Sequence, residues 1–375
     1  MKLSEQEQQR YARQILLPEV GQAGQERLKS SRVICIGAGG LGCPALTYLA
    51  ASGVGEITIV DGDDISFSNL HRQILFIESE EGENKALVAA RKLQAQNPHI
   101  VCKAVNQNLD TENVRSLLTG CDLVLDGSDN FATRYLVNDA CVELGIPFIS
   151  ASIFRFEGQV GVFNAPTSDG KITASYRCLF PEPPSLAERP PCSEAGVLPV
   201  VPGVLGVLQA NEALSFLLTG HVSTKEMFFT FDLSTHTFHS CALSRDEEQC
   251  KNTRILSQGE YEALMHQECE CHGGLMAVRE REAEEVISLA EQDKVYLIDV
   301  RESFERDAFH IGGKHIPLGF LDREIESIPR DKEVVFYCHS GIRSYQAIQF
   351  LQQEYGLTNA TNMRGGVAAL KKYPG

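Results

Sequence analysis

The stretch from Arg32 to Arg72 constrains the fold more than any other part of the chain. An apolar run at 33–36 leads directly into a glycine-rich turn at 37–42. A helical apolar pattern follows, and then a second apolar run at 57–60 that ends in Asp61. This order of strand, G-x-G-x-x-G turn, helix and strand predicts a βαβ unit of a parallel sheet.

The same turn predicts a phosphate site. Glycine has no side chain, so backbone N–H groups can approach a phosphate closely, and the N-terminus of the next helix adds a favourable dipole. Asp61 follows the turn by about 20 residues, the distance at which an acidic side chain can meet a ribose hydroxyl. The unit therefore predicts a bound nucleotide, and the candidate phosphate-binding residues are Gly37, Gly39, Gly40 and Gly42.

Three basic side chains around this unit favour ATP over a dinucleotide. A triphosphate carries more charge than a pyrophosphate, and Arg13, Arg72 and Lys85 can balance it. Asp129 follows another apolar run at the edge where ligands gather in open α/β sheets, and its carboxylate is a candidate Mg²⁺ ligand. Two alternatives stay open on this pattern: a nicotinamide-dependent oxidoreductase, and a scaffold that binds a carrier protein without turnover.

Several motifs that occur in order along residues 4–245 resemble the adenylating enzymes of the molybdopterin-synthase and thiamin-biosynthesis type, which are bacterial relatives of ubiquitin-activating enzymes. The matching segments are 10–14, 17–21, the glycine turn, 69–73, Lys85 and 127–130. The resemblance implies ATP-dependent adenylation of the C-terminal glycine of a ubiquitin-like sulfur carrier that ends in Gly-Gly. It assigns ATP binding to Gly40, Asp61, Asn69, Arg72, Lys85 and Asp129. It also implies a homodimer, in which Arg13 reaches the triphosphate of the neighbouring subunit.

Cys338 is the strongest candidate nucleophile. It follows a β-rich run, shares a short loop with Gly341 and precedes a helix. Backbone N–H groups in such a loop can converge on the sulfur and favour an accessible thiolate. Residues 275–375, with this loop and the segments 298–301 and 310–317, resemble single-domain rhodaneses. That resemblance implies a sulfurtransferase that carries a persulfide on Cys338, loaded by an upstream donor such as a cysteine desulfurase or thiosulfate.

The remaining cysteines raise two further questions. Cys192 stands at the end of a Pro-rich segment that predicts a long loop crossing the sheet. The family resemblance implies a role for it in attacking the acyl adenylate or in carrying a transient disulfide, and an ordinary loop thiol is equally compatible with the sequence. A metal site at Cys269, Cys271 and His272 has unusual spacing for zinc and is not expected.

The sequence departs from its family where relatives hold structural zinc with two C-x-x-C pairs. Here the first pair reads Ser175 to Cys178 and the second reads Glu247 to Cys250, so each has lost its first cysteine. A hydroxyl and a carboxylate beside two thiolates match the usual structural zinc ligands poorly. No structural zinc is expected.

Length and net charge limit the possible domain organisation and the possible partners. The 375 residues and the pattern of elements predict an α/β protein with a Rossmann-like adenylating domain at 1–245, a linker at 246–274 and a smaller rhodanese-like domain at 275–375. A net charge of −16 disfavours nucleic acid as a partner. Polar residues interrupt the most apolar long segment, 197–218, so no membrane span is expected. A polar N-terminus and twelve cysteines indicate the reducing cytoplasm.

Overall fold

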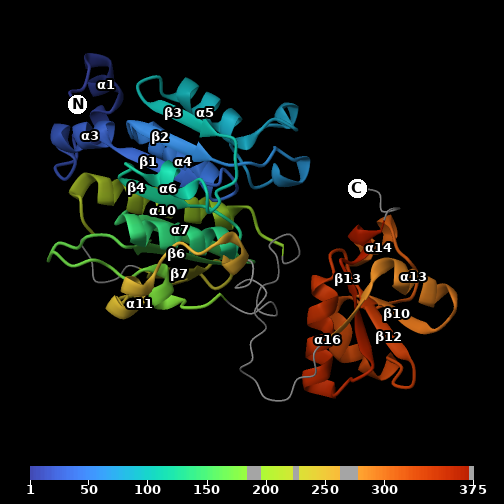
Figure 1. The fold of residues 1–375 in the computed structure, drawn as a ribbon. Helices are drawn as coiled ribbons and strands as arrows, with labels where there is room; N and C mark the ends of the chain where they lie inside the picture. Colours follow the sequence, from blue (N-terminus) through green and yellow to red (C-terminus); the bar gives the residue numbers. More distant parts are fainter. Residues whose placement is uncertain (184–195, 223–227, 262–277, 371–375) are drawn as a thin grey trace. The chain divides into compact units, whose positions relative to one another are not determined.

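The structure, a computed structural model, describes residues 1–183, 196–222, 228–261 and 278–370. The chain forms two compact units. The described part of the first ends at Tyr261, and that of the second begins at Val278. Each unit is an α/β structure with its own sheet (Figure 1).

The first unit contains an eight-stranded mixed sheet in the order β3-β2-β1-β4-β5-β6-β7-β8. Strands β1 to β5 run parallel, and β6 to β8 extend the sheet antiparallel. The strand order reverses between the neighbouring strands β1 and β4. The connection that follows β1 leads to β2 on one side, and the connection that follows β4 leads to β5 on the other. The strands are β1 (Arg32–Ile36), β2 (Glu56–Val60), β3 (Val101–Val105), β4 (Leu123–Asp126), β5 (Phe148–Phe154), β6 (Glu157–Phe163), β7 (Phe228–Asp232) and β8 (Thr237–Cys241).

Two hydrophobic cores cover the two faces of this sheet. One contains the apolar sides of α3, α4, α5 and α10, and the other contains those of α6, α7 and α8. The helices are α1 (Glu5–Arg10), α2 (Ala12–Ile15), α3 (Gly21–Ser30), α4 (Gly42–Ser52), α5 (Lys85–Gln96), α6 (Val114–Leu118), α7 (Phe131–Leu144), α8 (Tyr176–Leu179), α10 (Val200–Thr219) and α11 (Glu247–Asn252), with short 3₁₀ turns η1 (Phe67–Asn69) and η2 (Glu78–Glu80).

Helix α10 is 20 residues long and is the one helix among the described residues with the length and apolarity of a membrane span. It packs against α4, β5 and β6, and half of its apolar window is buried. Gln209 lies on the buried side and donates to the carbonyl oxygens of Asp126 and Ile149. These contacts are those of a core helix.

The second unit has a five-stranded parallel sheet in the order β11-β10-β12-β13-β9. Helix α16 packs on β12 and β13, and α13 packs on β9 and β10. The elements are β9 (Arg279–Glu282), α13 (Ala283–Glu291), β10 (Val295–Asp299), α14 (Ser303–Ala308), β11 (Lys314–His315), η4 (Leu318–Phe320), α15 (Leu321–Glu324), η5 (Ile325–Ser327), β12 (Glu333–Tyr337), α16 (Ile342–Tyr355), β13 (Ala360–Arg364) and η6 (Val367–Ala369).

The predicted α/β class, with a mixed Rossmann-like sheet and a second small sheet, is confirmed. The predicted linker begins later in the structure than at residue 246, because residues 246–261 pack on the first unit. Cys250 contacts α8, and Tyr261 is buried with its hydroxyl donating to Asp139 on α7. Charged residues at 245–249 mark a solvated turn and helix surface, and they do not mark the end of the folded unit.

The close packing of α10 on α4 depends on Gly206. A Cβ at this position would lie 2.3 Å from the carbonyl oxygen of Leu41, a backbone atom that cannot rotate away. We expect Gly206→Ala to lower the free energy of unfolding by about 1–3 kcal/mol through overpacking. Gly259→Ala is the matched control, because Gly259 is also helical and has nothing within 4 Å. Chemical denaturation measures both, and equal stability of the two variants would contradict this account of the packing.

Candidate active sites

The glycine turn lies where β1 ends and α4 begins, beside the end of β4. Gly37 has φ +90°, and a Cβ there would lie 3.0 Å from the carbonyl oxygen of Gly127. A Cβ at Gly42 would lie 2.1 Å from the carbonyl oxygen of Gly37. Only glycine fits these two positions, so the turn brings its backbone to the point where the strand order reverses, the usual ligand crevice of such sheets.

Asp61 ties this turn to the end of β2. Its Oδ2 accepts from the backbone N–H of Ala38 at 2.7 Å, and its Oδ1 accepts from that of Asp63 at 2.9 Å. Burial raises the pKa of the Asp61 carboxyl, and the two N–H donors partly offset that rise. Asp61 is therefore a half-buried acceptor that touches the glycine turn.

Arg72 lies beside the turn at Gly40, and Asn69 pairs with it. Asn69 Oδ1 accepts from Arg72 Nη2 at 2.6 Å, which orients the guanidinium. A Cβ at Gly40 would lie 3.6 Å from Arg72 Cγ, so the arginine side chain passes directly beside the turn. The structure brings these two predicted site residues together with the glycines.

Gln73 belongs to the same surface and is absent from the predicted site. It is 4% exposed, and its Nε2 would lie 3.7 Å from a Cβ at Gly39. Its Oε1 is buried and has no hydrogen-bond partner among the described residues. The sequence signal that could have identified Gln73 is its position directly after Arg72. A segment that places the Arg72 side chain beside the glycines also brings the next residue close to them.

Lys85 begins helix α5 and is almost fully buried, with 6% of its side chain exposed. Its Nζ lies 2.9 Å from Oδ2 of Asp63, whose side chain is 65% exposed. Asn84 caps α5 through Leu87 N–H and donates to the backbone carbonyl oxygens of Asp61 and Asp63. This lysine is thus held beside Asp61 by the loop that follows β2.

Asp129 is exposed in the loop between β4 and α7. The fully buried Asp126 fixes that loop, because it accepts from Ser128 and from Arg134. The next residue, Asn130, caps α7 by accepting from Thr133 N–H. The Asp129 carboxylate has no hydrogen bond or ion pair within the described part of the chain, and Asp126, which sequence reasoning did not single out, supports its position.

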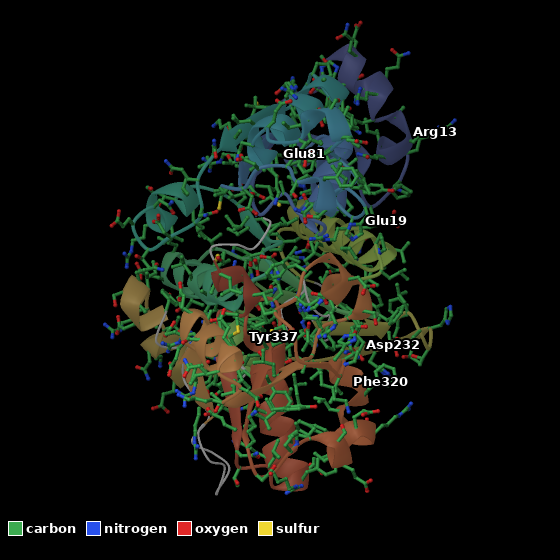
Figure 2. The ribbon with its side chains drawn as sticks, turned by 90° about the vertical axis from the view of Figure 1, so that its right-hand side faces the viewer. Arg13, Glu19, Glu81, Asp232, Phe320 and Tyr337 are labelled. Carbon is green, nitrogen blue, oxygen red and sulfur yellow. The ribbon has the colours of Figure 1, made fainter. Side chains whose placement is uncertain are left out.

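Arg13 lies on the short helix α2, and its side chain is exposed. Figure 2 shows it at the outer edge of the N-terminal helices, directed into solvent. Among the described residues it makes no hydrogen bond or ion pair with Arg72, Lys85 or the glycine turn of the same chain.

In the second unit, Cys338 lies between β12 and α16. Its Sγ accepts from Gly341 N–H at 3.1 Å and from the Ser344 hydroxyl at 3.5 Å. Gly341 has φ +91° and caps α16, which aims its N–H at the sulfur. Cys338 is 0% exposed, so the predicted accessible thiolate is wrong for this structure. The turn at 365–368 covers the loop, since Val367 and Ala368 donate to the carbonyl oxygens of Cys338 and His339.

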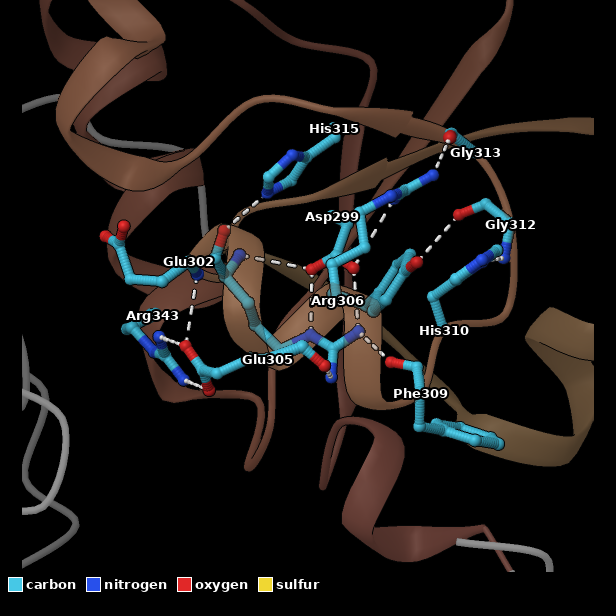
Figure 3. A network of polar contacts seen from close by, with 12 residues as sticks. Asp299, Glu302, Glu305, Arg306, Phe309, His310, Gly312, Gly313, His315 and Arg343 are labelled. Atoms are coloured by element: carbon cyan, nitrogen blue, oxygen red, sulfur yellow. Dashed lines mark hydrogen bonds and ion pairs between the residues drawn. The ribbon is translucent and has the colours of Figure 1, made fainter.

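An ion pair from α14 holds Arg343 at the start of α16, and further ion pairs surround Asp299 at the end of β10 (Figure 3). Both nitrogens at the tip of Arg343 donate to Glu305, each at 2.7 Å. Arg301, 1% exposed, donates twice to the buried Asp299. His315 contacts the carbonyl oxygen of Arg301 at 2.7 Å, and Arg306 donates to Gly313. The segments 298–301 and 310–317 therefore contribute the buried polar contacts around the site. Glu305 is the ion-pair partner of Arg343, and the sequence analysis did not identify it.

The two incomplete C-x-x-C pairs do meet in space. Cys178 Sγ lies 3.5 Å from Cys250 Sγ and 3.3 Å from Ser175 Oγ. The Glu247 carboxylate lies beside Arg245 and is 68% exposed. Within the described residues no three His, Cys, Asp or Glu side chains gather as a metal site. Cys192, Cys269, Cys271 and His272 lie outside the described residues.

The fold and the two sites define a nucleotide-binding α/β unit joined to a cysteine-loop α/β unit. The ThiF family model matches residues 11–252, and the rhodanese-like domain model matches residues 282–373. The chain belongs to the ThiF family and carries a rhodanese-like domain, which confirms the resemblance noted in the sequence.

Three similar proteins illustrate the relationship. The probable adenylyltransferase/sulfurtransferase MoeZ of Mycobacterium tuberculosis is 36% identical over 99% of this chain and 94% of its own. The sulfur carrier protein adenylyltransferase of Thermus thermophilus is 51% identical over 58% of this chain and 80% of its own. A crystal structure of E. coli MccB with ATP is 25% identical and covers 65% of this chain and 75% of its own, with a TM-score of 0.53.

The geometry at Cys178 and Cys250 generates a prediction about metal content. Purified protein should contain far less than one zinc per chain, because two thiolates and a hydroxyl do not complete a structural zinc site. A chelator should accordingly leave the melting temperature unchanged. Elemental analysis checks the first statement and a thermal melt with EDTA the second. Stoichiometric zinc would show that other side chains complete the site.

Proposed function

We propose that the chain activates the C-terminal glycine of a ubiquitin-like sulfur carrier with ATP and then converts it to a thiocarboxylate with sulfur from a persulfide on Cys338. The observation that carries this proposal is the joining, in one chain, of two sites. One is a glycine turn flanked by Asp61, Arg72 and Lys85, and the other is a helix-capped cysteine loop. The MoeZ relative, similar over nearly the full length, is named for both activities.

In the first reaction the carrier carboxylate attacks the α-phosphorus of ATP. A new O–P bond forms, the bond to the bridging oxygen breaks, and pyrophosphate leaves. No general base is needed, because a carboxylate is already ionised at neutral pH. Arg72 and Lys85 offset the charge on the phosphates, Asn69 orients Arg72, and Asp61 accepts from the ribose.

Magnesium is the metal that this reaction would use. Asp129 fits the task of holding it, because its exposed carboxylate stands at the end of β4 without a partner among the described residues. Bound there, the ion would neutralise part of the phosphate charge.

In the second reaction the outer sulfur of the Cys338 persulfide attacks the acyl adenylate. A C–S bond forms and the C–O bond to AMP breaks. AMP is released, and an acyl disulfide joins the carrier to Cys338. A thiol then attacks the sulfur of Cys338, which releases the carrier thiocarboxylate and leaves a disulfide between Cys338 and that thiol. Cys192 is the candidate for that thiol, and a cysteine desulfurase or thiosulfate is the candidate sulfur donor for Cys338.

A homodimer of the first unit completes the proposal. Arg13 is exposed on α2, and its charge is thus available to a second subunit. Helix α10 supports such contact, because Val200, Val204, Val207 and Leu208 line a shallow apolar hollow on its outer side.

The two alternative functions left open by the sequence are an oxidoreductase and a non-catalytic scaffold. No specific observation in the structure favours either of them.

Adenylation is tested by ATP–pyrophosphate exchange, which should require a carrier ending in Gly-Gly. Lys85→Ala or Asp129→Ala should lower the exchange rate by about 10²-fold or more, the usual loss when one preorganised electrostatic group is removed. Lys103→Ala is a matched control, because Lys103 is an exposed lysine of β3 paired only with Glu56. Exchange that neither Lys85→Ala nor Asp129→Ala changes would refute the assignment.

Separation of the two reactions is tested at Cys338. Cys338→Ala should keep adenylation near the wild-type rate, because the thiol belongs to the other unit and contacts no phosphate in the proposed reaction. It should abolish thiosulfate:cyanide sulfurtransfer and thiosulfate-dependent thiocarboxylate formation, while free sulfide should bypass the block.

The readout is mass spectrometry of the carrier, which detects replacement of one oxygen by sulfur. Cys192→Ala should retain exchange and form less thiocarboxylate, and Cys241→Ala, at an exposed cysteine of β8, is the control that should change neither. Full thiosulfate-dependent conversion by Cys338→Ala would remove Cys338 from the mechanism.

A further inference from the structure

Cys178 and Cys250 form a thiol pair that neither proposed reaction uses. They are 72 residues apart in the sequence, and the packing of α11 on α8 brings their sulfurs to 3.5 Å. Cys178 is partly exposed, and Cys250 is 6% exposed. Both are free thiols in the structure.

The surroundings of Cys178 are built to hold a thiolate. Its sulfur accepts from the backbone N–H groups of Ser175 and Asp246, both at 3.3 Å, and the Ser175 hydroxyl lies at the same distance. The Cys250 thiol can donate a further hydrogen bond. Burial alone would raise the pKa of Cys178, but these hydrogen bonds outweigh burial and lower it, whereas burial raises the pKa of Cys250. One thiol is thus poised as a nucleophile beside a second thiol that keeps its proton.

We propose that Cys178 and Cys250 are a redox-active dithiol that a peroxide converts into a disulfide joining α8 to α11. The sulfurs need to approach by about 1.5 Å to reach the length of a disulfide bond. The distance is short enough for side-chain rotation in a half-exposed site, and it does not require the two helices to separate and repack.

The chemistry proceeds in two balanced steps. The Cys178 thiolate attacks one oxygen of hydrogen peroxide, an S–O bond forms, the O–O bond breaks, and the hydroxide that leaves takes up a proton to become water. The Cys250 sulfur then attacks the sulfenic acid sulfur, the S–S bond forms, and the oxygen leaves as a second water with the thiol proton. Two thiols lose two electrons and one peroxide gains them. A dithiol reductant of the thioredoxin class reverses the reaction.

The consequence is structural. Cys250 lies in the segment 246–261 that closes over α7 and α8, so the disulfide would fasten that segment to the body of the first unit. Because the cross-link closes a loop of 72 residues, it lowers the entropy of the unfolded chain and stabilises the folded unit. Under oxidising conditions the pair therefore links α8 to α11 covalently.

The experiment uses the full chain, first reduced and then exposed to a small excess of hydrogen peroxide. Remaining thiols are blocked with N-ethylmaleimide, and the digested protein is analysed by mass spectrometry. We expect a peptide pair linked through Cys178 and Cys250, two hydrogens lighter than the reduced peptides and released by dithiothreitol. The exposed Cys241 should be recovered as the blocked thiol at the same dose. Oxidation should raise the melting temperature by about 5 °C or more.

Variants distinguish the roles of the two sulfurs. Cys250→Ser should stop at the sulfenic acid of Cys178, which a cyclic 1,3-dione traps, and its melting temperature should not respond to peroxide. Ser175→Ala should raise the pH midpoint for alkylation of Cys178 by iodoacetamide, because one donor to the thiolate is lost. Cys241→Ser should behave as wild type.

Recovery of both Cys178 and Cys250 as separately blocked thiols in the wild-type protein, at a dose that oxidises Cys241, would overturn the proposal. So would a sulfenic acid that persists on Cys178 while Cys250 is present. None of these measurements uses ATP or a carrier, so their outcome is independent of the proposed function.

Discussion

The hydrogen bond between Asp61 and the backbone of Ala38 is the contact on which the nucleotide site depends. It joins the end of β2 to the glycine turn, and Gly37 N–H is already committed to the carbonyl oxygen of Val60. The turn therefore has one position relative to the sheet, fixed from both β1 and β2. Because Asp61 is partly buried, its hydrogen bonds are stronger than they would be in water. Oδ2 holds the glycine turn and Oδ1 accepts from Asp63 N–H, and in the proposed reaction the same carboxylate accepts from the ribose.

The cysteine loop uses the same physical arrangement for a different anion. Each site stands where a parallel strand ends and a helix begins, β1 before α4 and β12 before α16. The unpaired N–H groups of a helix N-terminus stabilise negative charge, which is phosphate in one proposed reaction and a sulfur anion in the other. In the second site the guanidinium of Arg343 is paired with Glu305, and the N–H of Gly341 and the hydroxyl of Ser344 donate to the sulfur.

The sequence predicted those parts of the molecule that depend on short spacings. The glycine turn, the placement of Asp61 and the cysteine loop each follow from residues that are close together in the chain, and the structure has them where the spacing indicates. The support for each site could not be predicted in the same way, because it comes from residues that the fold brings together. Asp126 and Glu305 have no local pattern that separates them from an ordinary charged residue. The burial of Cys338 depends on the turn at 365–368, which packs over the cysteine loop although it lies almost 30 residues further along the chain.

Residues 246–261 belong to the first unit although their charged and polar sequence is typical of a linker. One contact that attaches them is made by a buried carboxylate, Asp139 of α7, which accepts two hydrogen bonds from Arg177 and one from the hydroxyl of Tyr261. Asp139 is 0% exposed, and removal of one partner from a buried charge pair usually costs about 3–5 kcal/mol. Arg177 is next to Cys178, so this network lies beside the Cys178–Cys250 thiol pair. The unit thus has a buried hydrogen-bonded link between α7, α8 and the segment after α11.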